Sequence, residues 1–338
     1  MSSHAFSTPT SSLPLDRRYL VPFLAAGFLL AAMLVCIGIG PVYLTPAEVW
    51  RALLSGETAS TADVIVRQIR LPRVLVGAMV GANLAMSGAI LQGITRNRLA
   101  DPHIVGISSG AGLVAVSCIV LFPVPLGLVS PLSFLGGITA GALAYLMAWR
   151  GGVSPERLAL AGIAVSAMLT AVTSAILVTS AFSAQIGLRW LIGGLLGRNW
   201  QDFRLLLPYF AIGSVASIAM ARQVNIIALG DEIATSLGQH VQRTRFMLAA
   251  TAAILASSAV SIAGLIGFIG LIVPHFVRLV IGNDYRFLLP TSALFGAILV
   301  VVADTVARTL FDPHELPVGV FTAVMGGPVF ILLVRRRT

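Results

Sequence analysis

The sequence contains no lysine, so its 22 permanently basic side chains are all arginines. Without lysine the chain has no Walker A phosphate loop, no Schiff-base lysine and no lysine general base. Charged residues make up only 10% of the chain, against about 25% in soluble domains. Cysteine is limited to Cys36 and Cys118, both within apolar runs, which excludes a disulfide framework and a cysteine metal site.

Hydrophobic residues, in contrast, make up 57% of the chain, and the mean hydropathy is +0.94. This apolar excess predicts a membrane protein. The net charge of +9 comes from arginines that lie between apolar segments. It therefore indicates membrane topology, with anionic lipid headgroups as counter-ions, and does not indicate a nucleic-acid partner.

A helix needs roughly 20 apolar residues to cross about 30 Å of hydrocarbon. Runs of this kind predict an all-α, polytopic membrane protein with about ten transmembrane helices in one domain, residues 20–338, after a disordered cytoplasmic N-terminus, residues 1–19. The runs lie near residues 20–40, 74–94, 103–122, 126–149, 158–182, 204–221, 246–264, 266–281, 288–307 and 317–334. The run at 266–281 is short for a full span.

Arginines crowd both ends of the chain, at Arg17, Arg18 and 335–337. The positive-inside rule then predicts cytoplasmic termini. Residues 41–63 become an outer connection, with an amphipathic helix from Pro46 to Leu54. The arginines that this topology leaves on the outer side call for a functional explanation; they are Arg51, Arg67, Arg70, Arg73, Arg189, Arg198, Arg204 and Arg308.

The two halves of the chain echo each other at an offset of 172 residues. Arg73 then falls on Arg245, and Pro102-His103 falls on Pro274-His275. The matching helices run in opposite directions in the predicted topology. The chain therefore has the character of an inverted repeat, a common construction in transporters.

Two intramembrane features allow more than one interpretation. Gly162, Ser166, Thr170 and Ser174 recur every four residues and share one helix face. Such a face either packs against a neighbour or lines a wet pathway. Asp304 lies one turn from Arg308, and a structural ion pair between them is favoured over a proton relay.

The segment from Gly230 to Gly238 predicts a short, separately capped cytoplasmic helix. Asp231 and Glu232 suit its N-terminus, and Gly238 suits its C′ position. A helix of this kind fits a docking surface for another protein, although an ordinary interfacial loop has the same pattern. The histidines, His4, His103, His240, His275 and His314, are scattered. We therefore expect no metal site, no cofactor site and no catalytic residue.

Several stretches together resemble the permease subunits of the ATP-binding-cassette importers that carry ferric siderophores, haem and cobalamin, the type II importers. They follow the family order across nearly all of the chain after the first helix. The stretches are Arg70-Leu-Pro-Arg73, 81–93, 97–112, 229–238, 264–278, 303–308 and 315–330.

The resemblance implies a homodimer of ten-helix subunits in a bacterial inner membrane, with a translocation path on the dimer axis. Two separate ATPase subunits would bind ATP and Mg, and a periplasmic binding protein would deliver the cargo. The coupling loop is expected at residues 222–245. The residues of the coupling helix would be Gly230, Asp231, Glu232, Ile233, Ala234, Thr235, Ser236, Leu237 and Gly238.

The resemblance also assigns two further sites. Arg70, Arg73 and Arg308 would pair with glutamates of the binding protein. The cytoplasmic gate maps onto Ser154-Pro155-Glu156, although some relatives have small hydroxyl residues there. The cargo expected from family frequency is an iron complex, haem or a ferric siderophore, ahead of cobalamin. The alternative function is a self-sufficient secondary carrier or channel, which would have no need for a coupling helix.

Overall fold

The computed structural model describes residues 15–54, 60–103, 105–122, 124–179, 181–310 and 315–335. Within these ranges the chain is helical and contains no β-strand. The first half contains α1 (Leu15–Gly38), α2 (Pro46–Leu54), α3 (Thr61–Val64), the π-helical turn η1 (Ile65–Arg70), α4 (Leu71–Thr95), α5 (Ile107–Val116), the π-helical turn η2 (Ser117–Leu121) and α6 (Leu126–Met147). The second half contains α7 (Pro155–Thr179), α8 (Ala181–Ile192), α9 (Trp200–Ala219), α10 (Ala221–Ala228), α11 (Asp231–Ser236), α12 (Val241–Ala263), α13 (Ile269–Ile281), α14 (Tyr285–Thr309) and α15 (Val318–Arg335).

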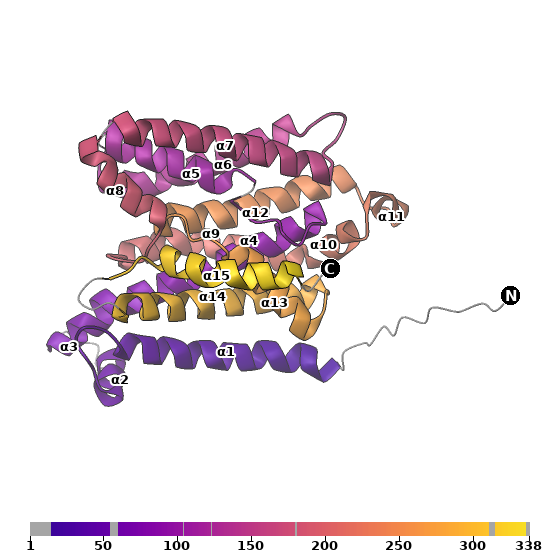
Figure 1. Cartoon of the computed structure of the whole chain (residues 1–338). Helices are drawn as coiled ribbons and strands as arrows, with labels where there is room; N and C mark the ends of the chain where they lie inside the picture. The colour runs from indigo at the N-terminus through magenta and orange to yellow at the C-terminus, as the bar shows by residue number, and fades with distance from the viewer. Residues whose placement is uncertain are drawn as a thin grey trace.

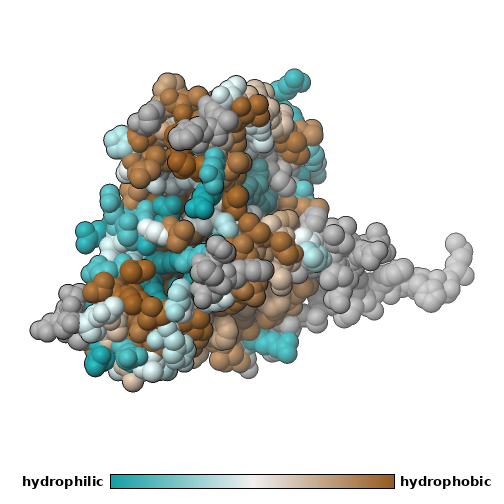
Figure 2. All heavy atoms as spheres, turned by 60° about the vertical axis from the view of Figure 1, so that its left-hand side comes forward, coloured by the Kyte–Doolittle hydropathy of each residue, from teal (hydrophilic) through white to brown (hydrophobic). Residues whose placement is uncertain are grey.

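Seven of these helices are long and apolar enough to span a membrane, and three shorter apolar helices accompany them. Every predicted run overlaps one of them, and α13 is short, as expected. α2 has the predicted bounds, Pro46–Leu54. Hydrophobic side chains cover much of the face drawn in Figure 2, and Phe23, Leu126 and Val178 are among the most exposed. The fold is therefore that of a polytopic membrane protein, with an outer surface suited to lipid.

α4 lies at the centre of the bundle and packs against α14, α12, α13 and α9. In its most apolar stretch 89% of the residues are buried, against 17% in α1, α7 and α9. Glycines allow this density, because a Cβ on Gly81 would collide with the carbonyl of Gly296 in α14, and one on Gly88 with the carbonyl of Gly270 in α13. Small residues thus bring helix backbones into contact, as in other membrane bundles.

The bundle has two distinct ends (Figure 1). α2 and α3 lie at one end, and α11 lies at the other, together with the first turn of α1 and the last turn of α15. α4 begins beside α3 and α12 begins beside α11, so these two packed helices run in opposite directions. This is the direction reversal that the inverted echo predicts. We refer to the two ends as the α2 end and the α11 end.

The structure differs from the expected start of the first helix and adds two short helices. α1 begins at Leu15, inside the segment predicted to be disordered, and the ring of Tyr19 packs edge-on against Phe287 at 5.2 Å. Residues 1–14 lie outside the described residues. α8 follows the predicted fifth span, and α10 occupies the first part of the predicted coupling loop. Both helices are shorter than the roughly 20 residues that a membrane span needs, so a search for apolar runs of that length does not find them.

Candidate functional site

The short helix α11 has the predicted C-terminal cap. The N–H of Gly238 donates to the carbonyl of Thr235, and the N–H of Gln239 donates to that of Ala234, both at 2.9 Å. These two bonds form a Schellman motif, and the positive φ of Gly238, 77°, is the backbone conformation that it requires. The sequence expectation for this segment as a separately capped helix is confirmed.

Two apolar side chains of this segment face outward. Ile233 is 50% exposed and Leu237, one turn later, is 61% exposed. Ala234, between them, is fully buried and holds the helix against the bundle. Leu229, which precedes the non-helical residue Gly230 and so lies outside α11, is also exposed. Ile233 and Leu237 therefore form an exposed apolar ridge at the α11 end of the bundle.

A buried arginine connects α11 to the rest of the protein. Arg245, in the second turn of α12, is fully buried, and its Nη2 lies 2.7 Å from Oδ1 of Asp231 in α11. Its Nη1 donates to the carbonyl of Val153, and the Gln242 side chain bonds both backbone groups of Val153. Arg245 thus joins three elements: α11, α12 and the turn before α7. In the sequence, the only sign of this role was that Arg245 aligns with Arg73 when the two halves of the chain are compared.

The predicted gate residues follow this turn directly. Arg157 folds back from the first turn of α7, and its guanidinium donates to Ser154 Oγ at 3.1 Å and to the carbonyl of Gly152 at 2.9 Å. Pro155 is buried and Glu156 is exposed. Ser154-Pro155-Glu156 is therefore held on one side by Arg157 and on the other by the contacts of Arg245 and Gln242 with Val153.

The hydroxyl face of α7 lies against α5 and the turn before it. Ser166 Oγ donates to the carbonyl of His103 at 3.0 Å, and Thr170 Oγ1 lies 3.5 Å from Ser109 Oγ. Gly162 is buried, whereas Ser174 is exposed. Within a single chain, Gly162 and Ser166 are covered, Ser166 by the turn before α5, whereas Thr170 and Ser174 are exposed.

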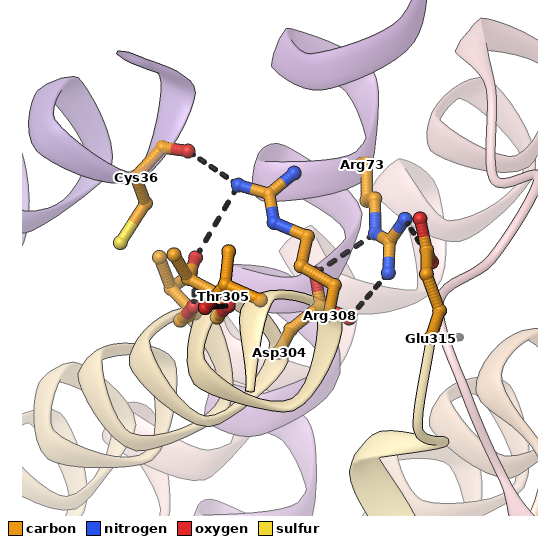
Figure 3. A network of polar contacts seen from close by, with 8 residues as sticks. Cys36, Arg73, Asp304, Thr305, Arg308 and Glu315 are labelled. Atoms are coloured by element: carbon orange, nitrogen blue, oxygen red, sulfur yellow. Dashed lines mark hydrogen bonds and ion pairs between the residues drawn. The ribbon is translucent and has the colours of Figure 1, made fainter. Parts of the chain in front are cut away.

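At the α2 end a buried ion pair joins α4 to α14 (Figure 3). Arg73 places Nε 2.8 Å from Oδ2 of Asp304 and Nη2 2.9 Å from Oδ1, which is a bidentate geometry. Its remaining nitrogen, Nη1, lies 3.0 Å from Oε2 of Glu315, just before α15. One arginine therefore connects α4, α14 and the segment leading to α15.

Arg308 does not pair with Asp304, so the predicted i, i+4 ion pair is wrong. Its guanidinium donates instead to the carbonyl of Cys36 and to Thr305 Oγ1 (Figure 3). Arg70 completes this arrangement by donating to the carbonyls of Ile37, at 2.8 Å, and Gly38, at 2.9 Å. The last carbonyls of a helix have no partner within it, and here two arginines satisfy those of α1.

The three arginines assigned to binding-protein docking, Arg70, Arg73 and Arg308, are thus between 3% and 7% exposed and are bonded inside the chain. Docking through these side chains stays a prediction, and it requires each of them to leave its internal partners. Other arginines of the α2 end are exposed: Arg51 of α2, Arg189 of α8 and Arg204 of α9. Among the described residues no group of three or more His, Cys, Asp and Glu side chains is placed to hold a metal ion.

Comparison with known proteins gives consistent matches. The model of the FecCD transport family matches residues 28–336. The cobalamin import system permease protein BtuC of Halobacterium salinarum is 48% identical over 82% of this chain and 75% of its own length. The Fe(3+)-citrate import system permease protein YfmE of Bacillus subtilis is 40% identical over 94% of this chain and 96% of its own length.

A solved structure matches equally well. It is described as an inward-facing conformation of a metal-chelate type ABC transporter, and it is similar with a TM-score of 0.85 and 30% identity. The match covers 94% of this chain and 99% of the other. The chain thus belongs to the FecCD transport family, as a multi-pass membrane permease subunit of an ATP-binding-cassette importer, a system that works with ATPase and substrate-binding partners.

Proposed function

We propose that this chain pairs with a second copy of itself to form the membrane path for an iron complex, haem or a ferric siderophore. Two separate ATPase subunits bind ATP and Mg and drive the transport, and a periplasmic binding protein delivers the cargo. One named relative imports ferric citrate, which supports an iron complex as the cargo, whereas the other imports cobalamin. No step of covalent chemistry is assigned to the chain itself.

The observation that carries this function is α11. A short capped helix with the exposed ridge of Ile233 and Leu237 suits a groove on another protein, and a self-sufficient carrier has no use for it. We place the ATPase at this surface and the α11 end in the cytoplasm, with both termini. Through this apolar contact with the ATPase, α11 acts as the coupling helix.

The contacts of Arg245 provide a route from this helix to the predicted gate. A movement of α11 acts on Asp231, which is bonded to Arg245, and Arg245 is bonded to Val153. Val153 precedes the gate residues Ser154, Pro155 and Glu156 at the start of α7. Rigid packed elements transmit such movements as discrete shifts. The hydroxyls of α7, Ser166 and Thr170 with Ser174, follow the gate along the same helix.

At the α2 end we assign first contact with the binding protein to the exposed arginines Arg51, Arg189 and Arg204. Arginines on an accessible surface steer a partner with acidic lobes and set its register. Arg70, Arg73 and Arg308 lie beneath this surface and would join the contact only after releasing their internal partners.

The test is transport into proteoliposomes that contain this chain and its cognate ATPase, with binding protein outside and ATP present or absent inside. Haem, a ferric hydroxamate and cobalamin are supplied separately. ATP-dependent uptake of haem or the ferric hydroxamate supports the proposal, whereas ATP-dependent uptake of cobalamin alone corrects the cargo. Uptake of any of them without ATP contradicts the importer assignment and favours a secondary carrier.

The role of α11 is tested separately by Ile233→Arg with Leu237→Arg. Both side chains are exposed, so the bundle should fold, while the charged ridge should reduce co-purification of the ATPase at least tenfold. Tyr43→Arg, at an exposed position of the α2 end, is the matched control and should retain the ATPase. Undiminished co-purification by the ridge variant would contradict the assignment of α11.

A further inference from the structure

A cavity of about 200 Å³ lies between the C-terminal half of α6 and the N-terminal half of α12. It exists because the facing positions carry small residues: Gly141 and Ala142 on α6, and Ala249, Ala250 and Ala253 on α12. Leu158 of α7 and Leu91 of α4 are among the residues that close it from within the bundle. The lining is almost entirely apolar, so an occupant must be apolar along most of its length.

One polar group lines this cavity. Tyr145 of α6 is 7% exposed, and its hydroxyl is buried without a hydrogen-bond partner among the described residues. A buried hydroxyl that lacks a partner carries a free-energy cost, which a ligand with an acceptor oxygen would relieve. The site therefore favours an apolar chain that carries at least one oxygen.

The mouth of the cavity has the composition of a membrane interface. The ring of Tyr145 lies 5.5 Å from that of Phe246 and 6.4 Å from that of Trp149, and Phe246 and Trp149 are about half exposed. Arg150 follows Trp149, and Arg243 lies one turn before Phe246 on the same face of α12. Both arginines are exposed, and neither forms a salt bridge in the described part of the chain.

We propose that this cavity binds one acyl chain of an anionic phospholipid, with the phosphate between Arg150 and Arg243 and an ester oxygen near the hydroxyl of Tyr145. The opening lies between two spans, α6 and α12, and we place lipid outside it. A basic interface and an apolar recess are the two parts that such a lipid needs. The proposal requires a membrane location, and it does not depend on the cargo or on the ATPase.

The location gives the lipid a structural role. The turn that carries Trp149 and Arg150 continues to Val153, which is bonded to Gln242 and Arg245 of α12. A lipid seated here connects the end of α6 to the start of α12. It therefore stabilises the turn at residues 149–153. The same turn connects α11, through Arg245 and Val153, to the start of α7.

The experiment uses the full chain in phosphatidylcholine vesicles that contain increasing mole fractions of either brominated phosphatidylglycerol or brominated phosphatidylcholine. Bromine on the acyl chain quenches tryptophan that it contacts, and the difference between wild type and Trp149→Phe isolates the signal of Trp149. We expect phosphatidylglycerol to quench Trp149 at a roughly 25-fold lower mole fraction, because two arginines contact its headgroup. Each headgroup arginine contributes about fivefold to this preference.

Three variants decide the outcome. Arg150→Gln with Arg243→Gln should abolish the lipid preference without disturbing the apolar core. Ala253→Phe, which fills the cavity, should reduce quenching by both lipids. Arg222→Gln, at another exposed position near the α11 end, should behave as wild type. Equal quenching by the two lipids, a preference that survives both site variants, or a Trp149 that neither lipid quenches because a second copy covers it, would each overturn the proposal.

Discussion

At the residue scale, the ion pair of Arg73 and Asp304 shows that the stability of this bundle depends on pairing its buried charges. Both side chains are less than a tenth exposed, and the two hydrogen bonds between them are 2.8 and 2.9 Å long. Removing one partner of a buried pair leaves the other charge uncompensated, which costs far more than the pair itself contributes.

Asp304→Asn should therefore lower the free energy of unfolding by about 3–5 kcal/mol. Replacing both partners, as Arg73→Met with Asp304→Leu, should recover part of this loss, because neither charge of the pair is then left buried, although Glu315 loses its partner Arg73. Unfolding in mixed micelles measures both effects. Arg198→Gln, which breaks the partly exposed i, i+4 pair with Asp202, is the control and should cost less than about 1 kcal/mol. A single and a double variant with equal losses would contradict this account.

Asp284, at the N-terminus of α14, predicts a pH dependence. Hydrogen bonds from the Arg286 side chain, with a smaller contribution from Asn225, lower the pKa of Asp284 from 3.8 to about 2. Because the folded pKa is the lower one, the stabilisation is complete above pH 3.8 and is lost as the pH falls from 3.8 to about 2. Thermal unfolding over this interval should show a steeper pH dependence for wild type than for Asp284→Asn; parallel curves would contradict the assignment.

Element scale: the close approach of α4 and α14 depends on glycine. A side chain at Gly81 would meet the backbone of Gly296, so the two helices must move apart to accept it. Gly81→Ala should lower the unfolding free energy by about 1–3 kcal/mol, the usual cost of overpacking. Gly27→Ala in α1 meets nothing within 4 Å and should be neutral or slightly stabilising, because alanine has the higher helix propensity. A comparable loss at both positions would show that packing is not the cause.

The elements also show which features the sequence could predict. α2 and the cap of α11 were predictable because proline, an early glutamate and a C′ glycine act on their immediate neighbours. The partner of Asp304 was not, because Arg73 lies 231 residues away and leaves no spacing to detect, whereas Arg308 offered a local but wrong alternative. The role of Arg245 depends likewise on Val153, 92 residues distant.

Whole-molecule scale: the two ends of the bundle should be accessible from opposite sides of the membrane. Cys36 and Cys118 are both buried, so the wild-type chain should show little labelling by a membrane-impermeant maleimide. In spheroplasts Tyr43→Cys, at the α2 end, should react at once, and Ser236→Cys, in α11, only after permeabilisation. The reverse order would place α11 outside and would contradict its contact with an ATPase.

The burial of α4 has a consequence for biosynthesis. Its polar side chains bond to elements made much later: Asn83 to Ser258, Gln92 to the carbonyl of Gly270, and Arg73 to Asp304. At about 5–20 residues per second, the ribosome needs roughly 10–50 s to add the 231 residues that separate Arg73 from Asp304. During that time α4 carries an arginine without its carboxylate, so a nascent chain truncated before α14 should be a preferred substrate of membrane quality-control proteases.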